Sequence, residues 1–96
     1  MAKAIWNGAV IAESDRCVRV GSQLYFPPES LNRALVSESD THTTCGIKLG
    51  RANYYNIAVG GKVNPDAAWY YPSFGNPAYQ YAEGYVAFWK GVEIVE

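Results

Sequence analysis

The segment Arg51–Val59 constrains the fold of this chain more than any other stretch. Its positions Tyr55, Ile57 and Val59 are apolar, and the alternate positions are mostly apolar as well. Successive side chains of a β-strand point to opposite faces of the sheet, so both faces of this strand need cover from other parts of the chain. The pattern therefore predicts a strand in the interior of a β-sheet.

Two-residue turns divide the rest of the chain into short strands. Asn7-Gly8 and Gly60-Gly61 are typical of tight hairpins, and Lys90-Gly91 marks a third turn. No segment of ten or more residues has helical periodicity, and only Glu29–Ala34 favours a helical turn. We expect one all-β domain over residues 1–96, with seven or eight strands and at most one short helical turn.

Several regions allow a more detailed prediction. The first 26 residues contain three or four short strands, interpreted as one meander that ends at Pro27-Pro28. The polar segment Ser37–Thr44 is either a loop or an edge strand. Pro65-Asp66 is expected to interrupt the strand that follows Gly60-Gly61, because proline lacks the N–H group that a β-ladder requires.

The charge balance limits the choice of partners. The formal net charge is −1, without a basic or acidic run, which argues against nucleic acid or an anionic membrane surface as the main partner.

No apolar run approaches the roughly 18 residues of a membrane span, and the amino terminus lacks the apolar region of a signal peptide. We therefore expect a soluble, cytoplasmic protein, monomeric or weakly dimeric. Its separated Cys17 and Cys45 should be free thiols.

Few residues are suited to a metal or to catalysis. A closed zinc site needs four Cys or His ligands, and the chain has two cysteines and one histidine, so no metal or cofactor is predicted. His42 and Cys45 could hold two corners of an open site, although His42 also fits an exposed loop. Cys45 could be a nucleophile activated by His42 or Lys48, or a small packed side chain. Cys17 is predicted to belong to the core.

Aromatic residues and one lysine point to a binding pocket. Tyr54 and Tyr55 face opposite sides of their strand, as do Trp69 and Tyr70, so one of each pair can build the core while the other faces a cleft. Lys48, in a glycine-flanked loop, could meet a ligand carboxylate or phosphate, or could simply be solvated. The predicted site has Thr44 and Cys45 as its floor, Lys48 as its charge, and Tyr25, Tyr54, Trp69 and Tyr70 as its walls.

Motifs along most of the chain carry a family resemblance. They are Trp6-Asn7-Gly8, Tyr25-Phe26-Pro27, Thr44-Cys45 with Lys48 and Gly50, Ala52 with Tyr54-Tyr55, Ala68-Trp69-Tyr70, and Tyr85–Phe88. Together they resemble the bacterial and fungal family known as domain of unknown function 427, which also carries a nucleotidyltransferase-like label. The resemblance implies a β-tent, in which small antiparallel sheets lean together at a steep angle. The chain departs from the family pattern at Gly46-Ile47, where the family often has proline and tryptophan, and at the additional Leu49.

Three functions follow from these observations as expectations. The leading one is the binding of a small metabolite in an aromatic pocket, and whether the protein is also an enzyme is left open. The first alternative is a protein-interaction module that uses exposed aromatics and edge strands. The second is the nucleotidyltransferase-like enzyme of the family label, for which the chain offers neither an Asp-x-Asp pair nor a Walker-type loop.

Overall fold

The computed structural model describes residues 1–96 as an all-β protein. Its strands are β1 (Ala2–Trp6), β2 (Ala9–Ser14), β3 (Val18–Val20), β4 (Gln23–Tyr25), β5 (Val36–Cys45), β6 (Gly50–Val59), β7 (Lys62–Tyr70), β8 (Val86–Phe88) and β9 (Glu93–Val95). Its helical segments are the 3₁₀ turns η1 (Pro28–Ser30), η2 (Arg33–Leu35) and η3 (Pro77–Ala82). The predicted all-β class is confirmed, with three short helical turns in place of one. None of these turns is long and apolar enough to cross a membrane.

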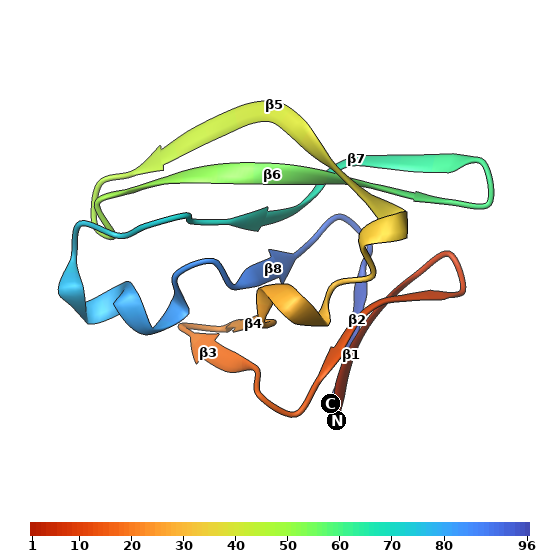
Figure 1. The fold of residues 1–96 in the computed structure, drawn as a ribbon, viewed down its shortest axis with the longest axis horizontal. Helices are drawn as coiled ribbons and strands as arrows, with labels where there is room; N and C mark the ends of the chain where they lie inside the picture. The colour runs from red at the N-terminus through yellow and green to blue at the C-terminus, as the bar shows by residue number, and fades with distance from the viewer.

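The strands form three antiparallel sheets. The largest has the order β5-β6-β7-β8, the second β2-β1-β9, and the smallest is the hairpin β3-β4. In Figure 1, β5, β6 and β7 extend along the long axis while β1 and β2 pass obliquely below them, and the two chain ends meet where β1 pairs with β9. The predicted meander of the first 26 residues is wrong, because β2 pairs with β1 and not with β3, so the two hairpins enter different sheets.

Each predicted two-residue turn is present. Both residues have positive φ in Asn7-Gly8 (49° and 80°), in Gly60-Gly61 (59° and 81°) and in Lys90-Gly91 (54° and 85°). Positive φ at both central positions defines the type I′ turn, whose twist matches that of the flanking strands. These local signals therefore determine where β1, β6 and the segment after β8 reverse direction.

The central strand and its neighbours follow the sequence pattern. β6 lies between β5 and β7, with Tyr55 and Ile57 buried. The segment Ser37–Thr44 is part of the edge strand β5, which was one of its two predicted states. Pro65-Asp66 interrupts the ladder at a bulge, where the β6–β7 register shifts between Tyr55 and Ile57. There the backbone N–H of Asp66 donates to Oδ1 of Asn56 at 3.0 Å.

Two apolar clusters fill the interior. The main core consists of Ala4, Ile11, Ala12, Phe26, Leu31, Tyr55, Ile57, Ala67, Ala68, Val86 and Phe88. Cys17 was predicted to belong to the core, but it precedes β3 and is half-buried, and it packs against this core from outside. The second cluster consists of Ala52, Tyr71, Phe74 and Ala82, with Val18, Val20, Cys45, Tyr54, Trp69 and Tyr79 packed around it. Tyr55 of the main core and Tyr54, packed on the second cluster, point to opposite faces of β6.

One backbone contact joins the small hairpin to the large sheet. Phe26 and Val86 exchange N–H···O hydrogen bonds of 2.7 and 2.8 Å. This isolated bridge fixes the end of β4 beside β8. It thereby brings Tyr25, the last residue of β4, next to the aromatic face of β7.

Candidate functional site

A hollow of about 280 Å³ lies between β4, β6, β7 and the turn that follows β5. This volume is close to the lower limit of small-molecule sites, roughly 300 Å³. Five of its lining residues are aromatic and one is a cation. The lining residues are Val20, Gln23, Tyr25, Lys48, Tyr54, Trp69, Tyr71 and Trp89.

The aromatic walls are fixed by strand register. Tyr54 of β6 is the cross-strand partner of Trp69 of β7, so both rings lie on one face of the sheet. The Trp69 indole N–H donates to the Tyr25 hydroxyl at 3.1 Å, and the two rings meet edge to face. Trp89 also meets Trp69 edge to face, with ring centroids 5.8 Å apart. These contacts connect three segments that are distant in the sequence.

Lys48 supplies the only charged side chain in the lining. Its ammonium lies 5.9 Å from the ring centroid of Tyr71 and 5.5 Å from that of Tyr79. The four ion pairs of the structure involve other residues, so no carboxylate neutralises this cation. A half-buried ammonium over aromatic faces is well placed to meet an oxygen of a ligand.

Cys45, at the end of β5, lies next to this lysine. Its sulfur accepts the Lys48 backbone N–H at 3.5 Å, and the Lys48 ammonium lies 3.9 Å away. The hydrogen bond from the Lys48 backbone N–H lowers the pKa of the Cys45 thiol, whereas burial raises it. The backbone N–H of Ile47 and the charge of the Lys48 ammonium also lower this pKa, so the net shift is downward. Burial first, and then the charge of Cys45, raise the pKa of the Tyr71 hydroxyl to about 12.

Two of the predicted site residues lie elsewhere. Thr44 is exposed and pairs with Arg51, so it points to the face opposite Cys45. Tyr70 stacks on Tyr55 at 4.9 Å and donates its hydroxyl to Glu38 at 2.7 Å, on the core side of the sheet. Burial and then the Glu38 hydrogen bond raise the pKa of Tyr70 to about 12. Alternation along β5 and β7 accounts for both placements.

The structure brings the other predicted residues together. Tyr25, Lys48, Tyr54 and Trp69 line the hollow, and Cys45 borders it through its contacts with Lys48. His42 does not approach Cys45, because three residues along a strand place them on opposite faces; its Nδ1 instead lies 2.9 Å from Oδ1 of Asn53. No group of three or more Cys, His, Asp or Glu side chains is arranged to hold a metal.

Several lining residues were not predicted from the sequence. Tyr71 follows Trp69 by two positions, so the strand alternation that excludes Tyr70 from the hollow could have identified it. Thr43 is not part of the lining, but by the same alternation it shares the face of Cys45, and its hydroxyl lies 3.0 Å from that of Tyr54. Trp89 follows β8 by one residue and reaches the hollow only through the β7–β8 pairing, for which no local signal exists.

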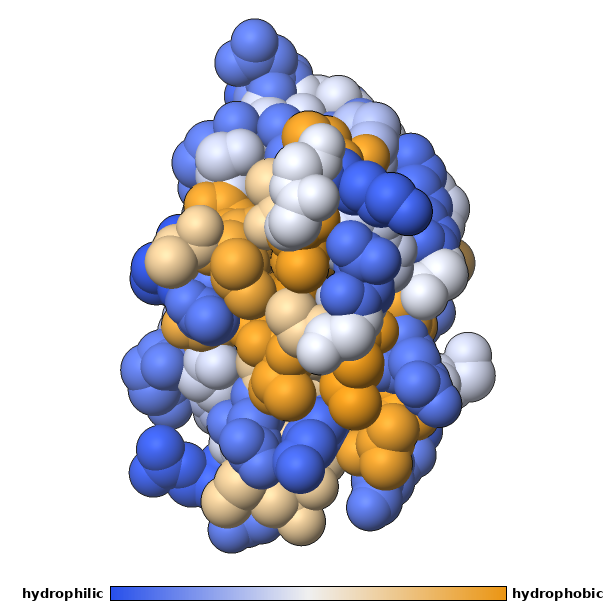
Figure 2. Space-filling model, turned by 90° about the vertical axis from the view of Figure 1, so that its right-hand side faces the viewer, coloured by the Kyte–Doolittle hydropathy of each residue, from blue (hydrophilic) through white to orange (hydrophobic).

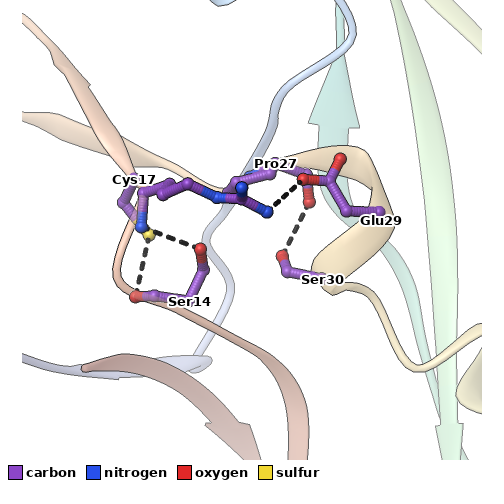
Figure 3. Close-up of polar contacts among 6 residues, drawn as sticks. Ser14, Cys17, Pro27, Glu29 and Ser30 are labelled. Atoms are coloured by element: carbon purple, nitrogen blue, oxygen red, sulfur yellow. Dashed lines mark hydrogen bonds and ion pairs between the residues drawn. The ribbon is translucent and has the colours of Figure 1, made fainter.

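Cys17 provides a contrasting environment near a second hollow. This hollow is lined by Met1, Ala2, Ser14, Asp15, Cys17, Leu24 and Glu96. Figure 3 shows the Cys17 thiol donating to the carbonyl oxygen of Ser14, next to the ion pair between Arg16 and Glu29. Burial first, and then the charges of Glu96 and Asp15, raise the pKa of this thiol. The pKa of the Cys17 thiol is therefore raised, whereas that of the Cys45 thiol is lowered, and the two thiols lie at different hollows.

Comparison with known proteins gives one family match. A family model labelled NTP_transf_9 and described as a domain of unknown function (DUF427) matches residues 1–96. Comparison with curated proteins gave no match.

Proposed function

The chain belongs to the DUF427 family over residues 1–96, and from its aromatic hollow we propose that it binds a small, flat organic molecule with an oxygen acceptor at one end. The observation that carries this proposal is the convergence of five aromatic rings and one unpaired ammonium on a single hollow. Aromatic walls favour a flat ligand, because they provide large apolar area with polar tips. The acceptor, a carboxylate or carbonyl oxygen, would lie at Lys48.

The lining favours a ligand orientation in which the oxygen acceptor lies at Lys48. The hollow contains no carboxylate side chain, so a ligand cation has no partner there. At the Lys48 end, the Tyr71 hydroxyl provides a second donor; with a pKa raised from 10.0 to about 12 it is protonated at neutral pH. At the opposite end, Trp89 is 45% exposed, which leaves an entry from solvent. The acceptor end of the ligand is therefore expected to lie deep and its apolar end near Trp89.

Binding can be followed through the tryptophans of the walls. Benzoate, a flat anion, should quench the fluorescence of Trp69 and Trp89 with saturation. Replacing the ammonium in Lys48→Met should weaken the affinity by about tenfold or more, the value of a charge-assisted hydrogen bond. The matched control is Lys62→Met, since Lys62 is an exposed lysine near the Gly60-Gly61 turn. Equal affinity of both variants, or no saturable quenching by the wild type, would contradict the proposal.

A second candidate function, a protein-interaction module, is favoured by one observation. Figure 2 shows apolar residues gathered in a band on the end of the molecule where the β1–β2 and β6–β7 turns lie. Near these turns, Val10 and Val63 are 39% and 63% exposed. Exposed apolar surface next to strand edges is typical of protein contacts. A mass from light scattering that falls to the monomer in Val63→Lys would favour this candidate.

The transferase activity in the family label finds less support in the geometry. Nucleotidyl transfer depends on carboxylates that hold Mg²⁺ and on donors for several phosphate oxygens. The lining of the hollow has no carboxylate and a single cation, Lys48. The structure therefore favours a ligand with one acceptor group over a nucleoside triphosphate.

A further inference from the structure

Cys45 and Lys48 form a compact pair at the edge of the aromatic hollow. The turn after β5 places the sulfur 3.5 Å from the Lys48 backbone nitrogen and 3.9 Å from the Lys48 ammonium. Lys48 itself lines the hollow, as does Tyr71, whose pKa responds to the charge of Cys45. A thiol, an ammonium and a phenol thus surround the place where we locate the acceptor end of the ligand.

We propose that Cys45 is a nucleophile that adds to the carbonyl carbon of a small, flat aldehyde or ketone held in the hollow. This inference rests on the proposed function and narrows its ligand class from an oxygen acceptor to an electrophilic carbonyl. The proposed reaction uses both the aromatic walls and the Lys48 end of the hollow. The aromatic walls would hold the flat body of the ligand, and the Lys48 end would hold its oxygen next to the thiolate.

The chemical step needs no further reagent. The Cys45 thiol first releases its proton to solvent, and the thiolate electron pair then forms a C–S bond to the carbonyl carbon. The C=O π pair moves to the oxygen, which takes a proton from the Lys48 ammonium, and water restores the proton on Lys48. The net reaction adds the thiol across the carbonyl and gives a thiohemiacetal from an aldehyde or a thiohemiketal from a ketone.

The surroundings of the two cysteines support a nucleophilic role for Cys45 alone. Backbone N–H groups and the Lys48 ammonium stabilise the Cys45 thiolate, and donors near the ligand oxygen stabilise charge that develops there. Cys17 instead donates its thiol to the Ser14 carbonyl and faces the carboxylates of Asp15 and Glu96. Each cysteine is half-buried, so exposure does not separate them.

The first test measures thiol reactivity without any ligand. The wild-type protein is treated with a limiting amount of iodoacetamide at neutral pH, and the two cysteines are quantified by peptide mass spectrometry. We expect Cys45 to be alkylated at least about tenfold faster than Cys17, because the thiolate is the reacting form. In Lys48→Met this difference should shrink, whereas in Lys62→Met it should persist. Equal rates at the two cysteines of the wild type would overturn the inference.

The second test uses benzaldehyde labelled with carbon-13 at the carbonyl. Wild type and Cys17→Ala should move the carbonyl resonance to the tetrahedral range, and Cys45→Ala should not. Benzoate binding in Cys45→Ala, followed by tryptophan fluorescence, shows that this variant retains its hollow. In the wild type, binding of benzoate without an adduct from benzaldehyde contradicts the inference and leaves the proposed function standing. A wild type that neither binds benzoate nor forms an adduct contradicts both the inference and the proposed function. An adduct trapped on Lys48 by borohydride also overturns the inference, since the amine would then be the nucleophile.

Discussion

Tyr54 and Trp69 are cross-strand partners between β6 and β7, so their rings lie side by side on one face of the large sheet. The hydrogen bond from Trp69 to the Tyr25 hydroxyl then ties this face to a hairpin from a different sheet. The hollow thus depends on one pairing within a sheet and one contact between sheets.

Trp69→Phe should weaken benzoate binding. The substitution removes the indole N–H that orients the Tyr25 hydroxyl and leaves extra space in the wall. A lost hydrogen bond and reduced ring contact together correspond to about tenfold in affinity, or roughly 1.4 kcal/mol. The control is Tyr70→Phe, next along the strand but on the core side, which should bind benzoate as the wild type does. The affinities are measured by titration calorimetry, and a similar loss in both variants would contradict the assignment of the walls.

Gly50→Ala should destabilise the protein. A Cβ atom at this position would lie 2.8 Å from Cδ2 of Tyr71 and 3.2 Å from the carbonyl oxygen of Ser73, which leaves too little space. Overpacking of this kind costs about 1–3 kcal/mol. Gly46→Ala is the matched control in the same hairpin, since nothing lies within 4 Å of the corresponding Cβ. Urea unfolding compares the two variants, and an equal effect would show that Gly50 is not tightly packed.

The Asn7 turn should contribute to stability in two separable ways. Asn7 has a φ of 49°, and its side chain donates to the Val59 carbonyl oxygen at 3.1 Å, linking two hairpins. Asn7→Gly removes only the hydrogen bond, which contributes about 0.5–1.5 kcal/mol. Asn7→Ala adds the strain of a positive φ, about 1 kcal/mol more. Urea unfolding should therefore rank the wild type above Asn7→Gly and Asn7→Ala last. The reverse order of the two variants would contradict this.

Stability should fall at alkaline pH. Burial raises the pKa of both Tyr70 and Tyr71 to about 12, from an ordinary value of 10.0. A raised pKa means that the folded state favours the protonated phenol, so its contribution is complete below pH 10 and is lost as the pH rises toward 12. Urea unfolding of the wild type should show this decline. Tyr71→Phe should show a smaller decline, whereas the exposed Tyr81→Phe should match the wild type. A wild-type stability that stays constant over this range would contradict the prediction.

Local signals accounted for much of the fold. The hairpin turns at Asn7-Gly8 and Gly60-Gly61 were predictable because asparagine and glycine readily adopt the positive φ that a two-residue hairpin requires. The apolar faces of Arg51–Val59 indicated a central strand, and the missing N–H of Pro65 indicated the interruption of β7. The meander prediction failed because strands that follow one another need not pair. β2 already pairs with β1, and the segment after Ser14 carries the chain to another sheet.

The site also depends partly on local sequence signals and partly on long-range packing. The sequence by itself determined which residues could build a pocket: the aromatic pairs, Lys48 and Cys45 all lie in strands or turns that their neighbours specify. Only the tertiary structure decided which face of the sheet meets the hollow; that choice places Tyr71 in the lining and Thr44 and Tyr70 outside it, and it brings in Trp89. The physical reason is that side-chain alternation gives relative facing within a strand, whereas which face meets a hollow depends on long-range packing. That packing here comes from the bridge between Phe26 and Val86 and from the pairing of β7 with β8.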